Sequence, residues 1–167
     1  MKIVCLTSHV YADEEPLHSD RQRIKRKAAL AEVAVKMLGN ILLIPENQKV
    51  ILTTMNDMNG KFEFISQSIF LDYRTESPFD FLINLSHEAI HSHQYYTNRM
   101  SFEIRDEKAF LIFDEKRYLN DRDTIISSIS PWEVEAYDME LEIATILRSE
   151  LIKGIFHESG RKRQATY

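Results

Sequence analysis

The segment from Ser77 to Tyr96 constrains the fold of this chain more than any other, because it holds the signals that start a helix and none that would end one. Serine commonly caps a helix N-terminus, and proline is favoured at the first helical position, where a backbone N–H would have no partner. The run after Pro78 contains neither glycine nor proline as far as Tyr96. We therefore predict a helix over this run.

The predicted helix has an apolar side with a polar stripe along its edge. Six residues at helical spacing form the apolar side: Phe79, Leu82, Ile83, Leu85, Ala89 and Ile90. His87 and His91 share a stripe beyond its edge, and Glu88 flanks them. We expect the apolar side to be buried and the polar stripe to face a cleft.

The polar stripe reads H-E-x-x-H over residues 87–91. Two imidazoles four residues apart lie one above the other on a helix, so His87 and His91 can reach a single ion. Neutral imidazole suits Zn²⁺, and a carboxylate such as Glu88 beside a zinc-bound water makes a hydrolytic centre. The competing interpretation is a pair of ordinary histidines, because a chain with 6 His and many glutamates can produce the pattern by chance. The helical context favours a metal site.

A catalytic zinc site typically uses three protein ligands, so a third ligand must come from elsewhere. The best source is segment 130–138, Ser-Pro-Trp-Glu-Val-Glu-Ala-Tyr-Asp, which opens a second amphipathic helix that we predict to run to about Ile152. Its predicted buried stripe comprises Trp132, Ala136, Met139, Ile143, Ile146 and Leu147. Glu133 and Glu135 fall near opposite edges of this stripe, with Glu135 somewhat closer. The projection therefore leaves both glutamates open as the third ligand.

Both glutamates, and an aspartate that follows them, also have structural interpretations. Ser130 followed three residues later by Glu133 forms a capping box, which needs no metal. Glu135 suits a solvated helix face. Asp138 either accepts the second N–H of a ligating imidazole or lies on a solvated face.

The two blocks together resemble the gluzincin metallopeptidases, in particular the small single-domain minigluzincins. The active helix of that group often reads H-E-x-x-H-x-x-Q, as residues 87–94 do here. Its third ligand is the first glutamate of a later E-x-x-A motif, a place that Glu133 takes in this chain. One departure is that Tyr137 stands where many relatives have an aspartate, with Asp138 one position later.

The resemblance implies a zinc metallopeptidase with Zn²⁺ held by His87, His91 and Glu133 and with Glu88 as the general base. It also implies an α+β fold in which a small sheet packs against the active helix and a second helix supplies the glutamate. An edge strand of that sheet would hold an extended peptide or protein substrate by main-chain pairing. The alternative is a catalytically inactive zinc-binding or protein-interaction module on the same scaffold, with His93 as a fourth ligand.

A peptidase also needs a donor for the oxyanion that forms during hydrolysis. Five side chains could supply it: Tyr95, Tyr96, His93, Tyr137 and His157. Each also reads as a core aromatic residue or a surface histidine, so the sequence does not choose among them.

The rest of the chain completes an α+β prediction. Between Ser19 and Leu38 apolar residues recur at helical spacing, and Gly39-Asn40 supplies a stop. That predicted stripe is Ile24, Ala28, Ala31, Val35 and Leu38. Apolar segments bounded by turn-forming residues predict strands over 41–44, 49–55 and 61–73. The short segment 109–113 fits either a strand or a helix.

Length and composition suit one compact enzyme. The chain has 167 residues, of which 44% are hydrophobic, so we predict that residues 1–167 form a single domain. Its tail over 154–167 lacks an apolar pattern, and we expect it to be mobile. The net charge of −5 argues against a nucleic-acid-binding protein. The single Cys5, in an apolar run typical of a buried strand, rules out an internal disulfide. No segment approaches the length of a membrane span, so we expect a cytoplasmic protein without membrane or nucleic-acid partners.

Overall fold

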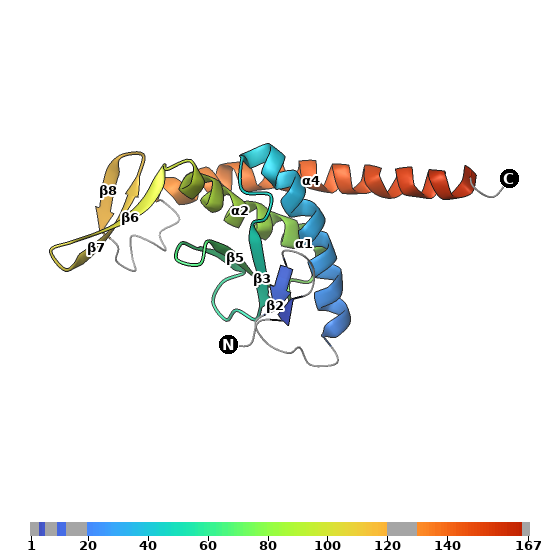
Figure 1. Cartoon of the computed structure of the whole chain (residues 1–167), viewed down its shortest axis with the longest axis horizontal. Coiled ribbons are helices and arrows are strands. Elements are labelled where there is room, and N and C mark those ends of the chain that lie inside the picture. Colours follow the sequence, from blue (N-terminus) through green and yellow to red (C-terminus); the bar gives the residue numbers. More distant parts are fainter. Residues whose placement is uncertain (1–3, 6–9, 13–19, 120–129, 165–167) are drawn as a thin grey trace.

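The computed structural model describes residues 4–5, 10–12, 20–119 and 130–164, which form an α+β fold with three helices and two β-sheets (Figure 1). The helices are α1 (Arg21–Leu42), α2 (Pro78–Tyr96) and α4 (Pro131–Gln164). The first sheet contains β1 (Val4–Cys5), β2 (Val10–Ala12), β3 (Lys49–Thr53), β4 (Gly60–Glu63) and β5 (Ser68–Asp72). The second sheet contains β6 (Met100–Arg105), β7 (Lys108–Phe113) and β8 (Lys116–Leu119).

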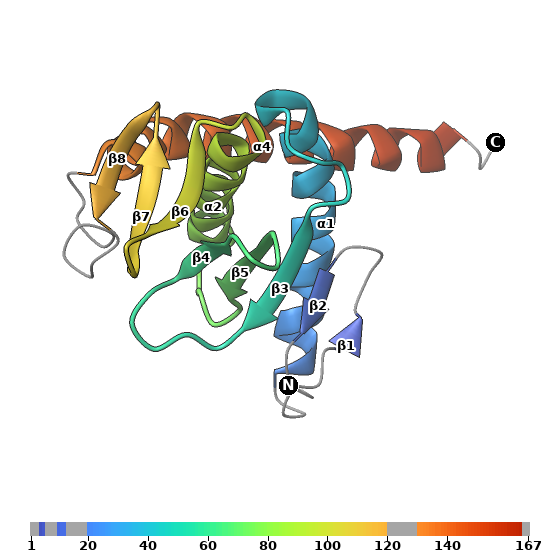
Figure 2. The ribbon, with the colours of Figure 1, turned by 60° about the vertical axis from the view of Figure 1, so that its left-hand side comes forward.

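The first sheet is mixed and has the strand order β1-β2-β3-β5-β4. Its three central strands are parallel, and β1 and β4 lie antiparallel at its two ends. The predicted strand over 61–73 is therefore two strands, β4 and β5, joined by a turn in which Gln67 has a positive φ of 49°. Helices α1 and α2 pack against this sheet (Figure 2), and for α2 this packing is what the resemblance to gluzincins implied.

Helix α2 begins as predicted, because the Oγ atom of Ser77 accepts hydrogen bonds from the backbone N–H groups of Phe79 (3.1 Å) and Asp80 (3.3 Å). Its predicted apolar side is buried at four positions and half-buried at two: Leu82, Leu85, Ala89 and Ile90 are buried, and Phe79 and Ile83 are half-buried. This side packs against the sheet and against α4. The histidines are thereby held at the boundary of the core.

Helix α1 buries its whole predicted stripe but ends later than the sequence suggested. The expected stop at Gly39-Asn40 and the expected strand over 41–44 are both wrong, because the helix continues to Leu42 and ends where Leu43 adopts a left-handed conformation (φ 55°). Leu42 lies one turn after Leu38 on the same face, and both are buried. The continuation therefore adds another apolar residue to the core.

The second sheet is an antiparallel meander that the sequence did not reveal apart from segment 109–113, which is strand β7. Its two turns are the pairs Asp106-Glu107 and Asp114-Glu115, in which all four residues have positive φ (48°, 62°, 45° and 67°). Two-residue hairpins need this conformation, but the usual signal for it is Asn-Gly or Asp-Gly. The sheet is anchored to α4 through a separate hydrophobic cluster of Met100, Leu111, Phe113 and Trp132.

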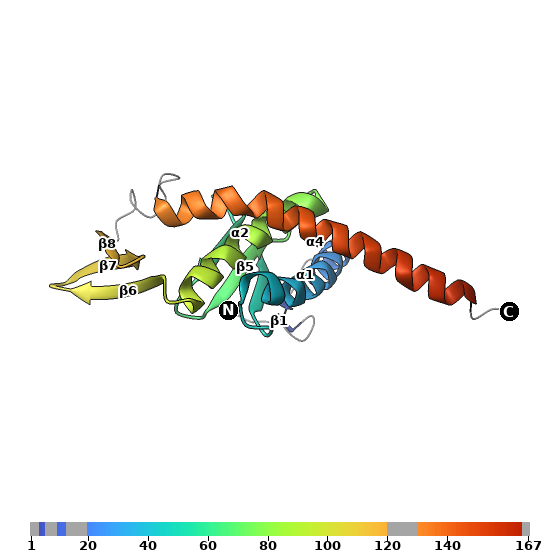
Figure 3. The same cartoon turned by 90° about the horizontal axis from the view of Figure 1, so that it is seen from above.

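Helix α4 crosses α2 and extends beyond the rest of the protein at its C-terminal end (Figure 3). It continues to Gln164, past the predicted end near Ile152. The prediction followed apolar periodicity, which indicates a buried face, and a helix that projects from the protein needs no such face. Ile146, predicted to be buried, is 41% exposed, and Ala144 is buried in its place. The side chains of Cys5 and His157 lie outside the described residues. None of the helices in the described part of the chain is both long enough and apolar enough to cross a membrane.

Candidate metal centre

Three of the predicted site residues meet where α4 crosses α2. His87 and His91 stand one turn apart on α2, and their Nε2 atoms are 3.1 Å from each other. Glu133, in the first turn of α4, places one carboxylate oxygen 3.2 Å from Nε2 of His87 and the other 3.4 Å from Nε2 of His91. Both oxygens of Glu133 therefore face the histidines.

The other ring nitrogen of each histidine has an acceptor of its own. Oε2 of Glu140 lies 2.7 Å from Nδ1 of His87. Oε1 of Gln94 lies 2.9 Å from Nδ1 of His91, and the amide nitrogen of Gln94 donates to the carbonyl oxygen of Trp132 (3.1 Å). A carbonyl can only accept, so this bond fixes the amide with its oxygen towards His91. In the neutral imidazoles both Nδ1 atoms therefore carry the proton, and both Nε2 atoms carry a lone pair.

Three electron-rich groups consequently face one another, an arrangement that attracts either protons or a cation. Burial lowers the pKa of His87, but the hydrogen bonds with Glu133 and Glu140 and the negative charges of Glu88 and Glu133 outweigh it and raise this pKa to about 9. Burial raises the pKa of Glu133, but the two histidines outweigh it and lower this pKa to about 2. His91 follows His87, with its pKa raised by Glu133 and Glu88 against the effect of burial.

The donor set fits Zn²⁺. Two imidazole nitrogens and a carboxylate oxygen are the ligands of many catalytic zinc sites. Zinc bond lengths of about 2.0 to 2.1 Å place neighbouring ligand atoms of a tetrahedron roughly 3.3 Å apart. The two Nε2 atoms are 3.1 Å apart, close to that edge length, and each has a different carboxylate oxygen of Glu133 at 3.2 or 3.4 Å. These donor atoms all lie within 4.8 Å of one another.

Glu135, the other candidate for the third ligand, points elsewhere. Its two carboxylate oxygens accept hydrogen bonds from the guanidinium of Arg99 (2.6 and 2.8 Å). Arg99 also binds Asp114, in the turn between β7 and β8. The helical projection could not separate the two glutamates, because Arg99, the partner of Glu135, lies in another segment of the chain, just before β6.

Glu88 is buried beside the three donors and lines the same cavity. Burial is the main cause that raises the pKa of its carboxyl group, against the opposing effect of His91 and His87. The backbone N–H of Phe62 in β4 also lowers this pKa. A Cβ atom on Gly60 would lie only 2.9 Å from Cγ of Glu88 and 3.0 Å from its Oε1 atom. The absence of a side chain at Gly60 therefore lets β4 approach the carboxylate.

Strand β4 lies at the outer edge of its sheet, next to the donors. The N–H of Asp72 donates to the carbonyl oxygen of Asn59 (2.9 Å). Because hydrogen-bonded and non-bonded pairs alternate in antiparallel strands, the backbone groups of Gly60 and Phe62 face away from β5. The effect of the Phe62 N–H on the pKa of Glu88 agrees with this orientation. The outer edge of β4 therefore forms part of the cavity wall.

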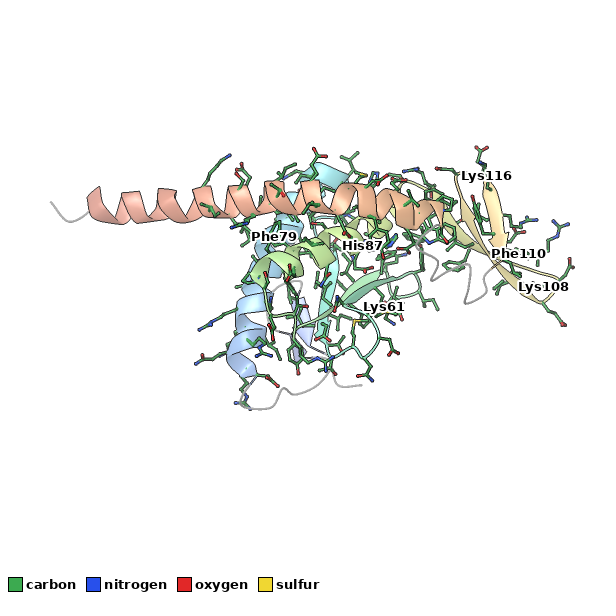
Figure 4. The ribbon with its side chains drawn as sticks, turned by 180° about the vertical axis from the view of Figure 1, so that it is seen from behind. Lys61, Phe79, His87, Lys108, Phe110 and Lys116 are labelled. Atoms are coloured by element: carbon green, nitrogen blue, oxygen red, sulfur yellow. The ribbon has the colours of Figure 1, made fainter. Side chains whose placement is uncertain are left out.

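The cavity around the donors has a volume of about 540 Å³ and is bounded by β4, α2, α4 and the second sheet. Figure 4 shows His87 on α2 between α4 and β4, with Lys61 of β4 nearby and with Lys108, Phe110 and Lys116 out on the second sheet. A cavity of this size accommodates a short stretch of peptide.

The oxyanion candidates separate clearly in the structure. His93 binds the carbonyl oxygen of Leu42 through Nδ1, so it faces α1 rather than the donors. The hydroxyl groups of Tyr95 and Tyr96 both bond to Gln67 (3.0 Å each). Tyr137 lines the cavity, with its ring centre 4.9 Å from that of His87. Burial, and then the nearby carboxylates, raise the pKa of its phenol.

Of the two interpretations of Asp138, the structure agrees with the solvated helix face. Asp138 is exposed, and Glu140 accepts from His87 instead. Glu140 lies two turns after Glu133, so the two carboxylates share one face of α4. That spacing of seven residues is a signal in the sequence that could have revealed Glu140.

Comparisons of the chain with protein-family models, with curated protein sequences and with solved structures gave no match. The relation to gluzincins therefore rests on the two motifs and remains a resemblance.

Proposed function

We propose that this chain is a zinc metallopeptidase, a hydrolase that cleaves peptide bonds in a peptide or protein substrate. The observation that carries the proposal is the convergence of the lone pairs of His87, His91 and Glu133 in a cavity that also contains the carboxylate of Glu88. Bound Zn²⁺ would lower the pKa of a water molecule and polarise the scissile carbonyl.

Each of the chain's own groups then has a defined task. The carboxylate of Glu88 accepts a proton from the attacking water and delivers it to the leaving nitrogen. The close approach of Gly60 in β4 leaves this carboxylate little room to move on that side. The hydroxyl of Tyr137 is the one donor among the described oxyanion candidates that lines the cavity.

The outer edge of β4 supports a peptide as the substrate. The outward N–H and C=O of Gly60 and the outward C=O of Phe62 can pair with an extended chain laid along the cavity. Such pairing recognises the backbone that peptides share. It would place the scissile bond beside the donors on α2.

An inactive structural zinc site has less support. Structural sites are closed by a fourth protein ligand. Within the described residues the donor cluster has three members, and His93, the expected fourth ligand, binds Leu42 instead. A site with an open fourth position suits hydrolysis.

The deciding experiment compares wild type with Glu88→Gln after zinc loading. We expect wild type to cleave a mixed library of quenched fluorescent peptides, and Glu88→Gln to keep its zinc and fold while losing cleavage by at least about a hundredfold. Glu142→Gln, which changes an exposed glutamate on α4, is the control and should cleave normally. Zinc-loaded wild type that cleaves no peptide in the library would overturn the proposal.

A further inference from the structure

The cavity beside the donors has two unlike sides. One side carries the donors, Glu88 and other polar groups. The other side, which we call the apolar wall, is built from the residue that follows β4, two strands of the second sheet and the start of α4. Its five members are Phe64, Met100, Phe102, Leu111 and Trp132.

The base of the apolar wall is a fixed part of the core. Met100, Leu111 and Trp132 are buried and pack together in the hydrophobic cluster that anchors the second sheet. Leu111 stands directly opposite Phe102 in the pairing of β6 with β7. Side chains alternate across a strand, so Met100, Phe102 and Ile104 share one face of β6. That face continues from the core out along the cavity.

Phe102 is the open part of this wall. Its side chain is 45% exposed, yet its ring packs edge-on against Phe64 at 4.6 Å between ring centres. Phe64 in turn packs against Phe62 (5.2 Å) and Tyr95 (5.8 Å), which belong to β4 and α2. This chain of rings fixes the position of Phe102 before any ligand arrives. A preformed apolar surface costs a ligand little ordering of the protein.

The apolar wall is also continuous with the donors. Trp132 immediately precedes Glu133 on α4, and both line the cavity together with Phe102. When the carbonyl group of a ligand reaches the donors, the side chain next to that carbonyl therefore lies against the apolar wall. We propose that the wall selects substrates that carry a large apolar or aromatic side chain beside the scissile bond, with Phe102 as a specificity-determining residue. This inference rests on the proposed function.

Hydroxamates test the inference without turnover, because a hydroxamate group chelates a metal ion whether or not the protein hydrolyses peptides. The probes are acetohydroxamate and 3-phenylpropanohydroxamate, which share the chelating group and differ in an apolar tail. Calorimetry on zinc-loaded protein, with loading verified by elemental analysis, gives the ratio of their two dissociation constants. We expect the phenyl compound to bind wild type roughly tenfold or more tightly than the methyl compound.

Three variants locate the source of this ratio. Phe102→Ala should reduce the ratio to about threefold or less, and Phe102→Leu, which keeps apolar area, should retain most of it. Ile104→Ala is the matched control, since Ile104 lies two residues along the same face, is 81% exposed and is not among the cavity-lining residues. An unchanged ratio in Phe102→Ala, or an equal fall in Ile104→Ala, would overturn the role of Phe102.

The outcome also separates this inference from the proposed function. If the protein prefers the phenyl hydroxamate through Phe102 but cleaves no peptide, the selective role of the apolar wall stands and the peptidase proposal fails. If the protein cleaves peptides yet binds both hydroxamates equally, the peptidase proposal stands and the selective role of the apolar wall fails.

Discussion

Arg99 donates two hydrogen bonds, of 2.6 and 2.8 Å, to the two carboxylate oxygens of Glu135. The same guanidinium binds Asp114 and lies over the ring of Phe113, 5.1 Å from its centre. Residues two apart on a helix point to different faces, so the group that draws Glu135 towards the second sheet leaves Glu133 facing the histidines. Arg99 thus links the second sheet to the helix turn that carries the third donor.

This relationship predicts which glutamate holds zinc. Glu133→Ala should lower zinc affinity by more than about a hundredfold, since loss of a direct ligand exceeds the 10- to 100-fold cost of losing a supporting group. Glu135→Ala should keep one zinc per chain. Elemental analysis after gel filtration reads both variants, and zinc loss in Glu135→Ala with retention in Glu133→Ala would reverse the assignment.

The acceptor of the His87 imidazole gives a second prediction. Glu140→Ala removes the carboxylate 2.7 Å from Nδ1 of His87, and we expect zinc affinity to fall about 10- to 100-fold. Asp138→Ala, which removes an exposed carboxylate from the same helix, is the matched control and should leave affinity unchanged. Competition with a chromophoric chelator measures both. Equal effects of the two substitutions would mean that only net charge matters.

Zinc affinity should depend on pH through His87. Burial lowers the pKa of this imidazole, but Glu133 and the other nearby carboxylates raise it to about 9. Protons and zinc compete for Nε2, so zinc must displace a proton at any pH below about 9. We expect affinity to rise about tenfold per pH unit between pH 7 and 8.5. Chelator competition measures the zinc affinity across that range, and an affinity that does not change with pH would contradict the prediction.

The same pKa shifts predict how the zinc-free protein responds to pH. The raised pKa of His87 contributes stability that is full below the ordinary value of 6.5 and is lost as pH rises through about 9. The lowered pKa of Glu133 contributes stability that is present above 4.5 and is lost as pH falls through about 2. Urea unfolding of zinc-free protein should therefore show this contribution at its greatest between pH 4.5 and 6.5. Glu133→Gln should flatten the profile.

The two well-described glycines predict opposite outcomes. Gly60→Ala would place a Cβ atom 2.9 Å from Cγ of Glu88 and 3.0 Å from Leu71, so Glu88 must move. We expect zinc binding to persist while peptide hydrolysis falls by about a hundredfold, since a small misplacement of a catalytic group has this effect. Gly39 lies within helix α1, and a Cβ there would have its nearest neighbour, the carbonyl oxygen of Ile44, at 3.5 Å, an ordinary contact. Gly39→Ala should therefore raise stability by about 0.5 to 1 kcal/mol and leave hydrolysis unchanged. Peptide cleavage assays measure the hydrolysis of both variants, and urea unfolding measures their stability.

Several elements could not be predicted because their signals are not local. The turns Asp106-Glu107 and Asp114-Glu115 adopt positive φ without glycine or asparagine, so the second sheet has no ordinary hairpin signature. The strand that borders the donors is likewise set by the sheet order, which places β4 outside β5 although it precedes β5 in the chain. Hydrophobic periodicity does not contain strand order.

The sequence by itself determined helix α2 and the two histidines on it that face Glu133. A serine cap, a proline and helical periodicity act within one segment, so they defined α2 and the stripe of His87 and His91 without reference to other parts of the chain. Only the tertiary structure brought Glu133 rather than Glu135 to the histidines, placed Glu140 behind His87 and laid Phe102 along the cavity. Each of these depends on which segments cross α2 and on the partners, such as Arg99, that those segments bring.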